Sequence, residues 1–163
     1  MVFVEDTYVG YLLKALPSEK KIQSDILFYL DHHHKGFVCK IELGAVPIKS
    51  KSGQTIGIRP FNNLYYRRYM SDILFIDRTG RAFFIEVKSP GVMRSISRRY
   101  HGDRSAWNKF LAKTENKVVS GQFHFLLDAA SRGISCGFAA NLEDVDEILK
   151  SRPGTVYMPE VTE

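Results

Sequence analysis

The chain has little of what several classes of protein require. Its two cysteines, Cys39 and Cys136, are too few for a disulfide framework or a cysteine-based zinc site, and we expect both to be buried thiols inside strands. The longest apolar runs are far shorter than a bilayer span, and no basic segment precedes an apolar one at the N-terminus. These absences favour a soluble cytoplasmic protein with no membrane partner, and leave a nuclear location open.

The composition is that of one globular domain with a charge bias toward polyanions. The 163 residues are 44% hydrophobic, enough for a single sizeable core. The net charge of +5 is a moderate bias toward nucleic acid. From Val92 to Lys117 there are seven basic residues against two acidic ones, so this segment alone carries a charge equal to that of the whole chain.

Two apolar runs in the middle of the chain predict a β-hairpin. The runs are Ile73 to Ile76 and Ala82 to Val87, and turn-forming residues separate them. We expect Asp77 and Arg81 to close a three-residue loop in which Gly80 takes the left-handed conformation. This loop fixes the register of the two strands.

The predicted register sets two carboxylates opposite each other at the open end of the hairpin. Asp72 faces Glu86, and Lys88 follows on the same face, because side chains alternate along a strand. Like charges directly across an antiparallel pair are destabilising, so something positive is expected between them. A divalent metal with oxygen ligands is the first candidate, with Lys88 as the neighbouring cation. A solvated surface hairpin is the alternative.

The same residues carry a resemblance to a known superfamily. Asp72, followed after the hairpin by Glu86-Val87-Lys88, resembles the PD-(D/E)XK nuclease signature, and its surroundings resemble the VRR-NUC branch most. Ser71 stands at the family's nominal proline, and a glycine often found close to the aspartate is missing. Neither departure touches a ligand position.

The resemblance implies a metal-dependent phosphodiesterase. Mg²⁺, with Mn²⁺ as a substitute, would be held by Asp72, Glu86 and the backbone carbonyl of Val87. Lys88 would orient or activate the attacking water and stabilise charge on the phosphorus. The resemblance also implies a restriction-endonuclease-like α/β fold with a mixed central β-sheet flanked by helices.

Two further polar residues match positions of the family. Glu19 opens a helix predicted from Ser18 to about His33, where the helix dipole alone would also favour an acid. Gln122 lies on the apolar stripe of a helix predicted over about 118–132, where it could simply bond to the backbone. The resemblance implies that Glu19 extends the metal shell and that Gln122 positions Lys88 or the water.

The organisation expected is a single nuclease domain over residues 1–163. Its core spans about 18–151, and a protruding hairpin is expected over 48–59. The basic insertion of about 92–117 is predicted as a loop followed by a helix from about Ser105 to Ala112. A last strand and helix follow, and a loosely ordered tail is expected over 152–163, with the option that it packs on a partner chain.

Basic and aromatic residues in three segments are candidates for gripping nucleic acid, because cations neutralise phosphates and rings stack on bases. The alternatives are an ordinary solvated basic face and aromatics that belong to the core. The candidates are Lys49, Lys51, Arg59, Arg67, Arg68, Arg94, Arg98, Arg99, Arg104, Trp107 and Lys109.

The predicted function is structure-specific cleavage of DNA in replication, recombination or repair. Small free-standing proteins of the VRR-NUC kind resemble cutters of four-way junctions, and a homodimer would present two sites to paired strands. Flaps, single-stranded ends and RNA remain open as substrates. The main alternative is a nucleic-acid-binding module that keeps the nuclease fold without turnover.

Overall fold

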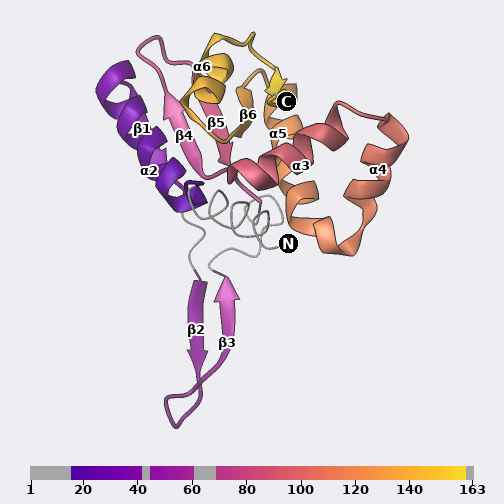
Figure 1. Cartoon of the computed structure of the whole chain (residues 1–163). Coiled ribbons are helices and arrows are strands. Elements are labelled where there is room, and N and C mark those ends of the chain that lie inside the picture. The colour runs from indigo at the N-terminus through magenta and orange to yellow at the C-terminus, as the bar shows by residue number, and fades with distance from the viewer. Residues whose placement is uncertain (1–15, 42–44, 61–68, 161–163) are drawn as a thin grey trace, which may run out of the picture.

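The structure is a computed structural model that describes residues 16–41, 45–60 and 69–160 (Figure 1). For the strands within 45–60, only the backbone is described. No helix in these ranges is long and apolar enough to cross a membrane.

A five-stranded mixed sheet forms the centre of the molecule. Its strand order is β1 (Phe37–Lys40), β4 (Ile73–Ile76), β5 (Ala82–Val87), β6 (Ser135–Ala139) and β7 (Val156–Tyr157). The first three strands are antiparallel neighbours, whereas β6 runs parallel to β5 and β7 parallel to β6. The fold is therefore α/β, and the predicted mixed sheet flanked by helices is confirmed.

The β4–β5 hairpin has the predicted register. Ile73 pairs with Ile85 and Ile76 with Ala82. Gly80 has a φ of +87°, the left-handed conformation that glycine adopts without a steric penalty. The Asp77 carboxylate accepts hydrogen bonds from the backbone N–H groups of Thr79 (2.8 Å) and Arg81 (3.0 Å) and from the Thr79 hydroxyl. These bonds lower the pKa of Asp77, with the hydroxyl bond as the largest cause, and fix the turn.

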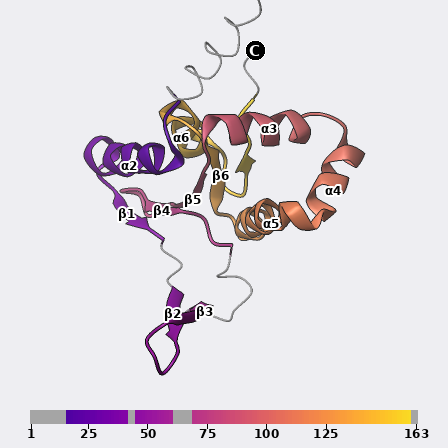
Figure 2. The same ribbon diagram turned by 60° about the horizontal axis from the view of Figure 1, so that its bottom comes forward.

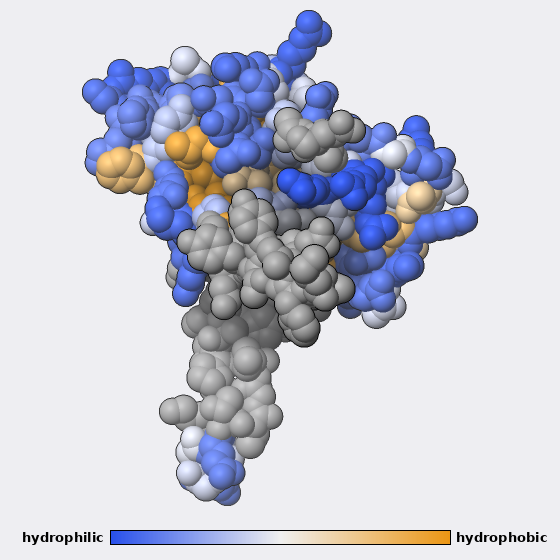
Figure 3. All heavy atoms as spheres, viewed as in Figure 1, coloured by the Kyte–Doolittle hydropathy of each residue, from blue (hydrophilic) through white to orange (hydrophobic). Residues whose placement is uncertain are grey.

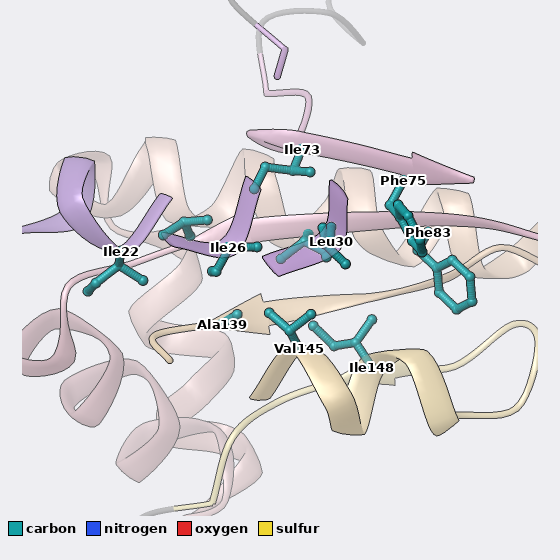
Figure 4. Packing of buried hydrophobic residues seen from close by; sticks show 11 residues of the cluster. Ile22, Ile26, Leu30, Ile73, Phe75, Phe83, Ala139, Val145 and Ile148 are labelled. Carbon is teal, nitrogen blue, oxygen red and sulfur yellow. The ribbon is translucent and has the colours of Figure 1, made fainter. Parts of the chain in front are cut away.

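Helices α2 (Glu19–Tyr29) and α6 (Leu142–Lys150) cover one face of the sheet (Figure 2). Both helices begin at a side-chain N-cap: the Ser18 hydroxyl accepts from Lys21 N at 3.3 Å, and the Asn141 amide oxygen accepts from Asp144 N at 2.8 Å. A π-helical turn, η1 (Leu30–His34), continues α2. Figure 4 shows apolar side chains from both helices meeting those of the strands; the cluster comprises Ile22, Ile26, Leu30, Ile73, Phe75, Phe83, Ile85, Val87, Ala139, Val145 and Ile148.

A second apolar cluster fills the opposite side of the sheet. Helix α5 (Lys117–Ser131) lies against β6 there, as predicted for this stretch, and ends before Gly133, whose φ is +85°. Helix α4 (Arg104–Ala112) packs against both α5 and α3 (Pro90–Tyr100), and the Tyr100 ring at the end of α3 contacts Phe123 of α5. Both faces of β5 are therefore covered. The cluster comprises Met93, Ile96, Trp107, Phe123, Leu126, Ala129, Cys136, Phe138, Ala140 and Met158.

The loop predicted between Val92 and about Ser105 is wrong, because most of it is helix α3. Pro90 follows the end of β5 and occupies the first turn of the helix, where its missing N–H leaves no bond unmade. Met93 and Ile96 then fall three residues apart on the buried side. The helix predicted from Ser105 is confirmed as α4, one residue earlier.

The loosely ordered tail is also wrong for the part that is described. Val156 and Tyr157 form β7 beside β6, and Met158 is 5% exposed within the second cluster. The tail thus packs on its own chain. Cys39, expected to be buried, is exposed on the edge strand β1, whereas Cys136 is buried as predicted.

The protruding hairpin is confirmed as a separate two-stranded sheet of β2 (Ala45–Lys49) and β3 (Thr55–Pro60) (Figure 1). Its turn is closed by a hydrogen bond from Ser50 N to the Gln54 carbonyl at 2.8 Å. Strand β1 of the central sheet ends at Lys40, and β2 belongs to the separate sheet.

Gly36→Ala is expected to destabilise the fold by about 1–3 kcal/mol, because overpacking a close contact costs this much. A β-carbon at Gly36 would overlap the Ile76 carbonyl oxygen and the Phe75 ring. Urea unfolding of this variant and of Gly91→Ala would measure the difference. Gly91 is the matched control, since nothing lies within 4 Å of its hypothetical β-carbon. Equal stability of the two variants would contradict the packing at Gly36.

Candidate functional site

Asp72 lies immediately before β4, one position beyond the last pair of the hairpin ladder, so the same register sets it opposite Glu86. Its side chain is held by the facing strand, because its Oδ2 accepts a hydrogen bond from Val87 N at 2.8 Å. Its main chain is held from the opposite side, where Ile41, the residue after β1, donates its N–H to the Asp72 carbonyl at 2.7 Å. The carboxylate is therefore fixed next to the Glu86-Val87-Lys88 end of β5.

Glu86 is a buried carboxylate with one oxygen unused. The residue is only 1% exposed. Its Oε1 accepts a hydrogen bond from Lys88 Nζ at 2.6 Å, and its Oε2 has no hydrogen-bond partner among the described residues. A buried acceptor without a partner costs about 1–3 kcal/mol, so it is retained for a reason other than stability.

The electrostatics of Glu86 reflect its neighbours. Burial raises its pKa to about 8, because a buried carboxylate is poorly solvated. The Lys88 cation opposes this rise, and the charges of Asp72 and Glu19 add to it. The structure therefore brings Asp72, Glu86 and Lys88 into one cluster and sets Glu19 within electrostatic range of it.

Lys88 is itself nearly buried, at 8% exposed. Its backbone N–H donates to the Ala139 carbonyl at 3.0 Å, which joins the end of β5 to the end of β6. Its ammonium pairs with Glu86, at 2.6 Å. A buried ammonium beside a carboxylate with one unpaired oxygen can contact an anionic ligand.

Gln122 lies in α5, and its amide oxygen is buried without a hydrogen-bond partner in the described part of the chain. The next residue toward the N-terminus, Gly121, lies so close to the Tyr69 ring that a β-carbon there would overlap it. The segment leading to Asp72 thus packs against α5 beside Gln122. Among the described residues, no hydrogen bond joins Gln122 to Glu86 or Lys88.

In the sequence, Ser71 stands out only as a departure from the family's proline, and no role is predicted for it. The structure shows it 1% exposed, with its hydroxyl oxygen buried and without a partner among the described residues. Three unsatisfied polar atoms, from Ser71, Glu86 and Gln122, therefore belong to residues of the predicted site or adjoining it.

Within the described ranges, no group of three or more His, Cys, Asp or Glu side chains is placed to hold a metal ion. Of the predicted ligands, Asp72 and Glu86 are the two carboxylates that the structure sets at the ends of facing strands. Glu19 is exposed at the start of α2 and contacts neither of them through a hydrogen bond.

The candidate nucleic-acid residues are distributed unevenly. Lys51 is exposed in the β2–β3 turn. The side chains of Lys49 and Arg59, and the whole of Arg67 and Arg68, lie outside what is described. The basic residues predicted within the insertion are all exposed on α3 and α4: Arg94, Arg98, Arg99, Arg104 and Lys109.

Trp107 differs from the other candidates. It is 6% exposed and packs among the rings of Phe110, Tyr100 and Phe123, with centroid separations of 5.2–5.5 Å. The structure places it in the core rather than on the surface, because α4 turns its apolar side toward α3 and α5. Its ring is not available to stack on a base.

Comparisons of the chain with models of protein families, with curated proteins and with solved structures find no match. The geometry of the site is therefore the basis on which a function can be proposed.

Proposed function

We propose that the protein is a Mg²⁺-dependent nuclease of the PD-(D/E)XK kind that hydrolyses phosphodiester bonds in DNA, with branched DNA as its substrate class. The observation that carries the proposal is Glu86, a carboxylate 1% exposed that keeps one oxygen unpaired beside Asp72 and Lys88. Buried, perturbed carboxylates cluster at functional sites.

The order of elements supports a restriction-endonuclease-like core. A first helix, α2, precedes three antiparallel neighbours, β1, β4 and β5; a helical segment then leads to β6, parallel to β5, and to α6. This is the arrangement that the sequence resemblance implies. The β2–β3 hairpin and the α3–α4 pair are additions to it.

The residues present fit a magnesium ion. Mg²⁺ prefers oxygen ligands and commonly uses one or two carboxylates, with water and substrate phosphate completing its shell. Asp72 and Glu86 supply such a pair, the unpaired Oε2 of Glu86 is an available ligand atom, and Val87 and Glu19 would complete the set. Bound Mg²⁺ supplies Lewis-acid polarisation of the phosphate and an acidified water.

The protein's own groups have separate tasks. Lys88 stabilises negative charge that develops on the phosphate oxygens and orients the water, and Glu86 and the Ala139 carbonyl hold the lysine in place. The Val87 N–H group holds the Asp72 carboxylate in position, so the side chain does not have to be ordered when the metal ion binds. Gln122 offers its unpaired amide oxygen as an acceptor for Lys88 or the water.

One observation favours a second candidate, a nucleic-acid-binding module without turnover. Lys88 Nζ lies 2.6 Å from Glu86 Oε1, so one Glu86 oxygen is already neutralised without a metal. In that case the cluster would be a structural ion pair, and the basic helices α3 and α4 would carry the function.

A panel of labelled substrates separates these candidates. We expect Mg²⁺-dependent cleavage of at least one of a four-way junction, a flap, a single strand, a linear duplex and an RNA strand. Ca²⁺ should support binding with little cleavage, and EDTA should abolish cleavage. Binding that is unaffected by EDTA, with no cleavage of any substrate in Mg²⁺ or Mn²⁺, would support the binding module.

A further inference from the structure

Helix α3 presents a basic face to solvent. Its buried side consists of Met93, Ile96 and Ser97, and it contains no acidic residue. Arg94, Arg98 and Arg99 are exposed, and among the described residues no ion pair joins them to a carboxylate. Unpaired guanidinium groups gathered on one helix repel each other, so the surface favours an anionic partner.

These arginines line a hollow between α3 and α4, which we term the α3–α4 groove. Its volume is about 530 Å³, and the α4 side is formed by small residues that leave room for a ligand backbone, Gly102 and Ala106. Asp103, the one acid in its wall, is engaged in capping α4, because its carboxylate accepts from Ala106 N at 2.7 Å. Figure 3 shows strongly hydrophilic residues over much of this part of the surface.

The groove continues into a second hollow of about 450 Å³ that shares Ser95, Arg99 and Ala106 with the first. This part adds Lys109, the half-buried ring of Phe110, and Lys113, whose ammonium lies 3.8 Å from the Glu115 carboxylate. The Arg99 guanidinium lies over the Phe110 ring, 5.0 Å from its centroid. Cations, with a guanidinium supported on an aromatic ring, thus line one continuous depression.

We propose that the α3–α4 groove binds the sugar-phosphate backbone of a single polynucleotide strand that adjoins the scissile phosphate. This inference rests on the proposed nuclease function. Arg94 and Arg98 are four residues apart on one helical face, which is about 6 Å along the axis and suits successive phosphates of one strand. Helix α3 begins two residues after Lys88, so its axis leads away from the site.

A single strand fits the groove better than a duplex does. Sites that hold single strands combine a cationic path with planar groups, aromatic rings or arginine guanidinium groups, on which unpaired bases stack. The exposed Arg99 guanidinium supplies such a plane at the far end of the groove, because Phe110, itself stacked on Trp107, supports it from below. A duplex keeps its bases stacked on each other and would use only the arginines.

Two double variants of equal charge test this proposal. Arg94→Gln with Arg98→Gln removes two cations from the groove, and Arg78→Gln with Arg152→Gln removes two exposed cations from other surfaces. Binding to labelled single-stranded DNA, single-stranded RNA and duplex DNA of equal length is measured in EDTA over a range of salt. Circular dichroism confirms that both variants fold.

For single strands, we expect the groove variant to bind on the order of tenfold more weakly, with a salt slope lower by about 1.4, the value for two lost phosphate contacts. The matched variant should stay near wild type. Comparable losses for DNA and RNA single strands would show that the backbone is what binds; a loss with one of them alone would identify that strand as the ligand. Equal losses in both variants, an unchanged slope, or a loss confined to duplex DNA would overturn the proposal.

The two proposals fail separately in this design. Binding in EDTA involves no turnover. A protein that cleaves nothing in Mg²⁺ but shows the expected slope change would therefore support strand binding by the groove and contradict the nuclease function. A protein that cleaves its substrate while the groove variant binds normally would support the nuclease function and contradict strand binding by the groove.

Discussion

Replacing Asp72 with asparagine is expected to lower the rate of Mg²⁺-dependent cleavage about a thousandfold, equivalent to about 4 kcal/mol of activation free energy. The substitution removes the charge that would hold the metal. Asparagine keeps a carbonyl oxygen at the same place, so it can still accept the 2.8 Å hydrogen bond from Val87 N. Single-turnover cleavage with saturating enzyme isolates the chemical step from binding.

Two controls sharpen this experiment. Asp77→Asn changes an aspartate at the opposite end of the same hairpin, where the carboxylate serves only the turn, and should cleave at the wild-type rate. DNA binding by Asp72→Asn in EDTA should equal or slightly exceed that of wild type, because one negative charge near the phosphate is gone. Near-wild-type cleavage by Asp72→Asn, in a folded protein, would remove the metal site from the proposal.

Lys88→Met is expected to destabilise the protein by about 3 kcal/mol at pH 9 and by about 1.4 kcal/mol less than that at pH 6, because one pH unit above the wild-type pKa of Glu86 corresponds to this difference. Breaking a buried pair from one side leaves a charge without compensation, and methionine preserves most of the apolar stem. Burial already raises the pKa of Glu86 to about 8, and Lys88 opposes that rise. Without the lysine the pKa of Glu86 rises further.

The sign of the pH dependence follows from proton uptake. Between the unfolded pKa near 4.5 and about 8, the folded state holds a proton on Glu86 that the unfolded state has released. The free energy of unfolding therefore falls as the pH rises through this window. In Lys88→Met the fall extends to higher pH, so the difference from wild type grows between pH 6 and pH 9.

Chemical unfolding at the two pH values measures this effect. The double variant Glu86→Gln with Lys88→Met serves as the control, because it has no carboxylate to titrate and should lose the pH-dependent part. A destabilisation of Lys88→Met that is the same at pH 6 and pH 9 would mean that the pair is not buried as described.

The hairpin that carries the site could be predicted because its determinants are local. Turn residues 77–81 and strict alternation fix the register within a dozen residues, and no distant part of the chain has to be known. The burial of Glu86 could not be predicted in the same way. It depends on α5, which covers the second face of β5, and on β6, which pairs with the free edge of β5; both lie more than thirty residues further along.

The elements that the sequence did not predict, α3 and β7, depend on contacts with other parts of the chain. Helix α3 has few apolar residues, and its buried side is defined only when Trp107 and Phe123 pack against it. Strand β7 is two residues long and gains its stability from pairing with β6. Trp107 is predicted from the sequence to contact nucleic acid because its neighbours are basic, although the aromatic contacts around it are those of a core residue.

The hydrogen bond between Ile41 N and the Asp72 carbonyl marks a point where the chain leaves the sheet and returns to the same place. The β2–β3 hairpin therefore lies between two chain positions, Ile41 and Asp72, that are anchored side by side at the sheet. Surface hairpins placed in this way tolerate changes of sequence and length, because both ends of the surrounding segment keep their places in the sheet. The hairpin can thus change without alteration of β4 and β5.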